Sequence, residues 1–127
     1  MFVALLSPEA EKRRVHALGM DPAVKQFRPS EAETAVRIEN HLGVRLRRAP
    51  AWSRADWVDQ YGRTYDAVGN FASCYFDRQW PQLRYQIERH LTKADLVPVD
   101  VSGFTPGQVR LVAQFITRFG QVFLVGH

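Results

Sequence analysis

Hydrophobic and polar positions repeat with two periods along the chain, which predicts a mixture of helices and strands. After Ser30, apolar residues recur at helical spacing over residues 31–42, and Gly43 follows as a left-handed helix cap. Ser30 and Glu33 predict a capping box, because each side chain can accept a hydrogen bond from the backbone amide of the other residue. From Val44 the period falls to two, which is typical of a strand with one solvated face.

The same two periods predict the other elements. Strands are expected at 44–49, 55–60 and 63–68, and Tyr61–Gly62 predicts a tight hairpin turn between the last two. Pro98 lies within an apolar run and indicates either a bulge or an edge strand. Further elements are expected as helices at 7–18, 78–92 and 105–119 (opened by Thr105–Pro106) and strands at 95–101 and 121–125. From residue 30 the order is α-β-β-β-α-β-α-β, which indicates an α/β fold with a small mixed sheet flanked by helices.

Length and charge narrow the class of protein. The 127 residues leave room for one domain, and a hydrophobic content of 46% is typical of a globular protein. We expect residues 1–29 to form a peripheral lead-in or linker remnant with a short helix, and residues 30–127 to form the domain. No apolar run is long enough to span a membrane, and the N-terminus is a poor secretory signal. The net charge of +4 favours a polyanion such as nucleic acid as the partner.

Several common catalytic motifs are missing from the sequence. It contains no glycine-rich phosphate loop and no Gly-x-Ser-x-Gly nucleophile motif. The four histidines lack the spacing of a helical zinc site, and the single Cys74 cannot form an intramolecular disulfide. These absences disfavour nucleophilic catalysis.

The acidic residues are more informative. Glu31 shares the apolar stripe of its helix, where a carboxylate must be paired or metal-bound unless it is simply an exposed first-turn acid. Asp56 and Asp66 lie in the two arms of the predicted hairpin and can approach each other on adjacent strands. A divalent ion such as Mg²⁺ would offset the repulsion between them. Asp59 is the alternative to Asp56, although a solvated turn residue is its simpler interpretation.

Basic residues predict phosphate contacts beside these acids. Arg45 and Arg47 share one face of a strand and would form a basic ridge, or else protect an edge strand from aggregation. Lys93 follows a helix end, where it could orient a water molecule and neutralise phosphate charge, or simply interact with the helix dipole. The residues considered for nucleic-acid contact are Arg45, Arg47, Arg48, Arg84 and His90.

The chain resembles the tRNase toxin domains of bacterial contact-dependent growth inhibition (CdiA-type) effectors over residues 27–126. The stretches that carry the resemblance are SEAETAVRIENHLGVRL, ADWVDQYGRTYDAVG and IERHLTKADLVPVDVSGFTPGQ. These domains are similar to the PD-(D/E)XK (restriction-endonuclease-like) nuclease superfamily. The resemblance therefore implies that superfamily's core and metal-dependent cleavage of tRNA. A DNase on the same core and a non-catalytic nucleic-acid or protein-binding module are the alternatives.

The resemblance also implies a set of site residues. Glu31, Asp56 and Asp66 correspond to its metal-binding acids, with Mg²⁺ as the first expectation and Zn²⁺ or Mn²⁺ as alternatives. The superfamily pattern places a lysine two positions after the second acid, where this chain has Val68. Lys93 is our candidate for the missing lysine.

Delivery and inhibition follow from the same resemblance. Such domains are carried by a larger secreted toxin, act in the cytoplasm of a target cell and are neutralised by a cognate immunity protein. We expect a monomer, or a heterodimer with the immunity protein, and no membrane contact. The present chain would then be an excised part that begins at an added Met1, which would explain the lack of a targeting signal.

Overall fold

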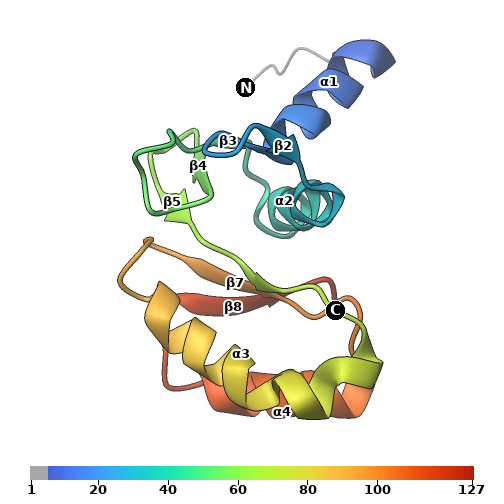
Figure 1. Cartoon of the computed structure of the whole chain (residues 1–127), viewed down its shortest axis with the longest axis vertical. Coiled ribbons are helices and arrows are strands. Elements are labelled where there is room, and N and C mark those ends of the chain that lie inside the picture. Colours follow the sequence, from blue (N-terminus) through green and yellow to red (C-terminus); the bar gives the residue numbers. More distant parts are fainter. Residues whose placement is uncertain (1–5) are drawn as a thin grey trace.

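The computed structural model describes residues 6–127. Figure 1 shows two halves: α1, α2 and β3–β5 lie in one, and β7 and β8 with α3 and α4 lie in the other. The helices are α1 (Pro8–Leu18), α2 (Pro29–Leu42), the 3₁₀ turn η1 (Ser73–Tyr75), α3 (Phe76–His90) and α4 (Pro106–Ile116). The strands are β1 (Met20–Asp21), β2 (Gln26–Phe27), β3 (Leu46–Arg48), β4 (Trp57–Asp59), β5 (Thr64–Tyr65), β6 (Val68–Gly69), β7 (Val97–Asp100) and β8 (Val122–Val125).

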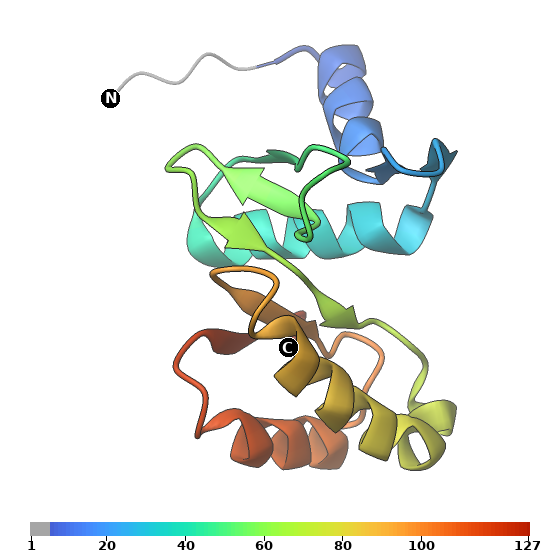
Figure 2. The same ribbon diagram turned by 60° about the vertical axis from the view of Figure 1, so that its left-hand side comes forward.

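The strands form small antiparallel and parallel sheets, so the expected α/β class is confirmed, but the single mixed sheet predicted from the sequence is divided into separate sheets. Strands β3, β4 and β5 form an antiparallel sheet, while β6, β7 and β8 are parallel. A parallel bridge between Tyr65 and Leu96 connects the two sheets along the continuous segment 64–69. Figure 2 shows this segment running from the hairpin half of the molecule into the other half. The short β6 adds one strand to the predicted order, and β1 and β2 form a separate two-stranded sheet.

Two hydrophobic cores stabilise the two halves. In one, Leu83 and Ile87 of α3 pack with Val97 and Val99 of β7 and with Val112 of α4. The other core lies between α2 and the antiparallel sheet, and its members include Leu18, Ala35, Ile38, Leu46, Trp57 and Tyr65. The parallel sheet contributes side chains to both cores, because neighbouring residues of a strand point to opposite faces.

The N-terminal helix packs against the rest of the domain. Leu18 at the end of α1 is buried, and its carbonyl oxygen accepts a hydrogen bond of 2.9 Å from Trp57 Nε1. Arg14 forms an ion pair of 2.8 Å with the buried Glu39, which also accepts from the amide of Leu46. The part of residues 1–29 that the structure describes is therefore integrated into the second core, whereas the domain boundary at residue 30 stays a prediction.

Two local expectations at helix ends need correction. The helix predicted at 31–42 begins at Pro29, and no side chain caps it, so the Ser30–Glu33 capping box is wrong. Proline is favoured in the first turn of a helix, and it places Ser30 inside that turn. A capping box does form at α4, between Thr105 and Gln108, although this helix ends at Ile116 and not at residue 119.

Pro98 lies in neither a bulge nor an edge strand, because β7 is the central strand of its sheet. Alternate amides of the chain face its two neighbours: Val97 donates toward the segment before β8, and Leu96 donates to the oxygen of Thr64. Pro98 has no N–H, and it faces the 64–69 segment in the gap between the Tyr65 bridge and β6. The missing donor therefore coincides with an interruption of the ladder.

Candidate active site

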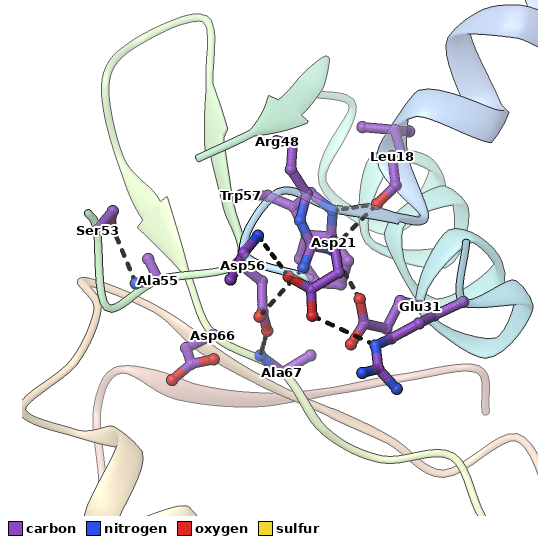
Figure 3. A network of polar contacts seen from close by, with 12 residues as sticks. Leu18, Asp21, Glu31, Arg48, Ser53, Ala55, Asp56, Trp57, Asp66 and Ala67 are labelled. Atoms are coloured by element: carbon purple, nitrogen blue, oxygen red, sulfur yellow. Dashed lines mark hydrogen bonds and ion pairs between the residues drawn. The ribbon is translucent and has the colours of Figure 1, made fainter. Parts of the chain in front are cut away.

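The hairpin of β4 and β5 brings Asp56 and Asp66 together, as predicted. The register pairs Trp57 with Tyr65, and the amide of Asp56 donates to the oxygen of Tyr65 at 2.8 Å. Asp56 and Asp66 are thus the next residues outward on the two arms. Asp56 Oδ2 accepts a hydrogen bond of 3.1 Å from the amide of Ala67 (Figure 3).

The surroundings of Asp56 disfavour its ionised form. Burial raises the pKa of Asp56 to about 8, and the hydrogen bond to Asp66 and the repulsion from its charge act in the same direction. The amide of Ala67 and the charge of Arg48 oppose this rise without cancelling it. The pair therefore needs a positive partner at neutral pH, either a shared proton or a cation.

Glu31 reaches the same place from α2 through an arginine. Arg48 Nη1 donates to Glu31 Oε2 at 2.8 Å, and its Nη2 lies 4.0 Å from Asp56 Oδ1. The Arg48 side chain is only 14% exposed and lies over the ring of Trp57, with 5.5 Å between the guanidinium carbon and the ring centroid. Arg48 was predicted to contact nucleic acid, and its side chain points inward because the pleat of β3 alternates its side chains.

Two hollows meet at these acids. One, of about 200 Å³, lies between α2 and the chain at 67–70, and Glu31 and Asp56 both line it. The other, of about 160 Å³, is also lined by Glu31 and Asp56, and it extends to Arg48 and to the loop before β4. Glu31 and Asp56 therefore border both hollows.

His90 lies behind the carboxyl pair, and sequence reasoning assigned it a different role. Its Nδ1 is 3.0 Å from Asp66 Oδ2, and its Nε2 is 3.1 Å from Gln86 Oε1. The side chain is 13% exposed and lies beside Asp66, and its predicted contact with nucleic acid stays a prediction. The signal for this position was available: His90 follows Leu83 and Ile87 at helical spacing, and both are buried core residues.

The unsatisfied polar atoms of the protein gather at this cluster. Within residues 6–127, the buried side-chain nitrogen and oxygen atoms without a hydrogen-bond partner are Arg48 Nε, Asp66 Oδ2 and His90 Nδ1. The His90 and Asp66 atoms are close, but they are not aligned for a hydrogen bond. Buried polar groups are nearly always paired in folded proteins, so such a concentration is typical of a functional site.

Asp59, the alternative to Asp56, has a structural role. Its carboxylate accepts from the amides of Tyr61 and Arg63, from the Arg63 guanidinium and from the Tyr65 hydroxyl. Burial opposes its ionisation, but these hydrogen bonds outweigh that effect and lower the pKa of Asp59. Asp59 is the last residue of β4 and is 1% exposed, so its simpler interpretation as a solvated turn residue is wrong.

The other predicted basic residues lie away from the two hollows. Lys93 follows α3 and lines neither hollow, and within residues 6–127 its side chain makes no ion pair. Arg45 and Arg47 are exposed on one side of β3 with Leu46 buried between them, so the ridge exists as a surface feature. Arg84 is exposed on α3 and stacks over Trp80. The roles of these four residues in binding or catalysis stay predictions.

Asp100 is a buried acid that sequence reasoning missed. It is 0% exposed, and its carboxylate accepts from Thr34 and Arg37 of α2 and from Ser102. Burial opposes ionisation, but the hydrogen bonds together lower the pKa of Asp100. Its position at the end of an apolar strand was the only sequence signal, and the partners on α2 lie more than sixty residues away.

The expected metal ligands fit a divalent ion in part. Asp56 and Asp66 are hard oxygen donors that face each other, and the unpartnered Asp66 Oδ2 can accept a cation. Glu31 is held by Arg48, and within residues 6–127 no group of three His, Cys, Asp or Glu side chains is gathered closely enough to bind a metal. Binding of a divalent ion by Glu31, Asp56 and Asp66 therefore stays a prediction.

The fold and the site together define a small α/β domain built around a cluster of acids, with two hollows bordering it. The chain belongs to the family of CdiA C-terminal tRNase domains, whose model matches residues 29–122. It is 37% identical to the tRNA nuclease CdiA of Burkholderia pseudomallei over an alignment of 114 residues, and the match covers 80% of this chain and 9% of that protein. The resemblance seen in the sequence is thereby confirmed.

A solved structure shares the fold. It is the CdiA-CT toxin from Burkholderia pseudomallei E479 in complex with its cognate CdiI immunity protein, with a TM-score of 0.66 and 25% sequence identity. The match covers 77% of this chain and 99% of that chain. Within residues 6–127, no helix is both long and apolar enough to cross a membrane.

Proposed function

We propose that this domain is a toxin ribonuclease that cleaves tRNA. The family and the relative named as a tRNA nuclease support this activity. The observation that carries it is the gathering of the buried unpaired atoms of Arg48, Asp66 and His90 around the coupled pair of Asp56 and Asp66. A folded chain maintains such a costly arrangement where it has chemistry to perform.

The proposed activity depends on a divalent ion. Asp56 and Asp66 would hold it, and a bound Mg²⁺ would polarise a phosphoryl oxygen and lower the pKa of a bound water. Arg48 lies 4.0 Å from Asp56 and presents positive charge to the phosphate, while Glu31 holds the guanidinium in place. His90 lies behind Asp66, with its Nδ1 at 3.0 Å from Asp66 Oδ2.

The PD-(D/E)XK core is part of the same proposal. The order of α2, the three antiparallel strands, α3 and β7 supports it. The lysine of that pattern is absent at Val68, and Lys93 stays our predicted replacement. Arg48 is the second candidate for the missing positive charge, because it already lies between Glu31 and Asp56.

The test is cleavage of purified bulk bacterial tRNA by the domain, with and without a chelator. Asp56→Asn should abolish cleavage without unfolding the protein, because asparagine has the shape of the protonated carboxyl group that burial favours here. Asp77→Asn, an exposed change in the first turn of α3, is the matched control and should cleave like the wild type. Intact tRNA beside cut plasmid would support the DNase alternative. If wild type cuts neither nucleic acid with Mg²⁺, Mn²⁺ or Zn²⁺ added, the nuclease proposal is wrong.

Delivery and inhibition are proposed on the same family evidence. The domain would be the C-terminal part of a larger CdiA-type protein and act in the cytoplasm of the target cell, where a cognate immunity protein blocks it. The exposed Arg45 and Arg47 would suit an acidic inhibitor. Expression of the wild type alone should stop bacterial growth, and co-expression of the immunity protein should restore it. Growth that continues without the immunity protein would contradict toxicity.

A further inference from the structure

Trp52 is an exposed tryptophan close to the acids. Its side chain is 85% exposed, the highest value among the large hydrophobic residues that the structure describes. It lies in the loop between β3 and β4, four residues before Asp56. Trp57 is buried in the core and Trp80 is half-buried, so Trp52 differs from the other tryptophans of the chain. The exposed indole ring offers a large flat apolar face that can contact a binding partner.

The loop presents Trp52 at the rim of one of the two hollows. Both of its neighbours, Ala51 and Ser53, line the hollow of about 160 Å³ that Glu31 and Asp56 also line. The amide of Ser53 donates to the oxygen of Pro50 at 2.8 Å, and the Ser53 hydroxyl accepts from the amide of Ala55 at 3.1 Å (Figure 3). These bonds fix the backbone of the loop beside this hollow, and the ring of Trp52 stays exposed.

A positive charge stands on the same loop. Arg54 is exposed, lines the same hollow, and makes no ion pair within residues 6–127. Arg48, in contrast, is already engaged with Glu31. A flat aromatic ring beside an unpaired guanidinium matches the two parts of a nucleotide, because the ring can stack on a base and the guanidinium can bind a phosphate.

We propose that Trp52 and Arg54 form a subsite for the nucleotide on one side of the cleaved bond, with Trp52 stacked on an unpaired base and Arg54 bound to a phosphate. The inference rests on the proposed ribonuclease function. Glu31 and Asp56 line both hollows, so a strand whose phosphate lies at these acids can extend into the hollow beside Trp52. The base must be unpaired because only an unstacked base can offer its face to the ring. The subsite therefore selects a loop or an unpaired end of the RNA.

Steady-state cleavage of bulk bacterial tRNA tests the subsite. Trp52→Ala should raise KM by about tenfold, since stacking on a single base contributes on that order, while kcat stays close to the wild-type value. Trp52→Phe should restore most of the affinity because it keeps an aromatic face. Tyr75→Ala is the matched control: Tyr75 is 53% exposed on η1 and lines neither hollow, so its KM should not change. Melting temperatures should be equal, because Trp52 contributes little to the core.

Intrinsic fluorescence provides a second readout without cleavage. In the Asp56→Asn background, a single-stranded oligonucleotide should quench the exposed Trp52, and Trp52→Phe should remove that quenching while binding persists. Quenching that persists in Trp52→Phe would contradict stacking on this ring.

The outcomes separate the two levels of the proposal. If wild type does not cut tRNA, the proposed function itself fails. If wild type cuts and Trp52→Ala keeps its KM, the subsite is wrong, and the exposed ring is left for a protein contact such as the immunity protein. An equal rise of KM in Trp52→Ala and Tyr75→Ala would also overturn it, because any exposed aromatic residue would then have the same effect.

Discussion

The carboxylate of Asp100 links α2 to β7, and we expect its loss to remove a large part of the stability of the domain. Oδ2 accepts from Thr34 Oγ1 at 2.6 Å and from Arg37 Nη1 at 2.8 Å. Oδ1 accepts from the amide and the hydroxyl of Ser102 at 3.0 and 2.6 Å. Because the side chain is 0% exposed, water cannot replace these contacts without opening the core.

The size of the effect follows from these four contacts. A hydrogen bond to a charged acceptor is worth about 1.5–3 kcal/mol, but the four are not additive, since they share one buried charge whose desolvation opposes them. Removing one partner of a buried ion pair costs about 3–5 kcal/mol. Arg37 is 31% exposed, so its guanidinium can be hydrated again when the carboxylate is lost. We therefore expect Asp100→Ala to lower the free energy of unfolding by about 3 kcal/mol, the lower end of that range. That is a large share of the roughly 5–15 kcal/mol typical of a small domain.

Urea unfolding at neutral pH measures this loss as a shift of the midpoint at constant slope. Asp77→Asn is the control for an exposed carboxylate and should change the free energy of unfolding by less than about 0.5 kcal/mol. A loss below about 1 kcal/mol for Asp100→Ala would refute the reasoning, because it would mean that Thr34, Arg37 and Ser102 find other partners at no cost.

The same carboxylate predicts a dependence on pH. Its pKa is lowered in the folded state, so the stability it contributes is present above its ordinary pKa of 3.8 and is lost as the pH falls through the lowered value. Asp100→Asn should therefore be less stable at neutral pH but lose less further stability on acidification than the wild type. Equal losses in the two proteins between neutral pH and acid would contradict the assigned shift.

Three further changes probe other parts of the fold. Gly69→Ala should destabilise by about 2 kcal/mol or more, because φ is +93° and the new Cβ would lie 2.5 Å from the oxygen of Asp100, and thermal unfolding should show it. Trp57→Phe should lower the free energy of unfolding in urea by about 2 kcal/mol, because the donor to the oxygen of Leu18 is lost. A loss of only a few tenths of a kcal/mol would show that this hydrogen bond to α1 is dispensable. Asp59→Asn should reduce the loss of stability at acid pH. The pKa of Asp59 is lowered in the folded state, so the stability that its carboxylate contributes is lost as the pH falls below its ordinary value of 3.8. An unchanged dependence of the free energy of unfolding on acid pH would exclude this role.

The sequence predicted those parts of the fold that depend on short-range patterns. Helix α2 and its left-handed cap at Gly43, and the turn at Gly62, follow from residues a few positions apart. The approach of Asp56 and Asp66 was predictable for the same reason, because the turn of a hairpin fixes the register of its two arms. Local sequence patterns are therefore sufficient to predict these elements.

What could not be predicted depends on long-range packing. The Ser30 capping box was wrong because Pro29 starts the helix one residue earlier, and spacing alone does not decide between the two signals. The inward direction of Arg48 depends on Glu31 and on the face of β3 that meets α2. The position of His90 beside the carboxyl pair was not predicted, because Asp66 lies in a segment that the sequence does not place against α3.

Helix α2 connects the candidate active site with the buried hydrogen bonds of Asp100. Helix α2 carries Thr34, which is bound to Asp100, and Glu31 one turn earlier, which holds Arg48 beside Asp56. The hairpin supplies the carboxyl pair from one half of the molecule, and α3 supplies His90 from the other. The unpaired buried atoms of Arg48, Asp66 and His90 are energetically unfavourable. The packing of the two hydrophobic cores must therefore hold the two halves in place. A change at Asp100 should therefore lower nuclease activity under conditions where the protein is still folded, although this residue lines neither hollow.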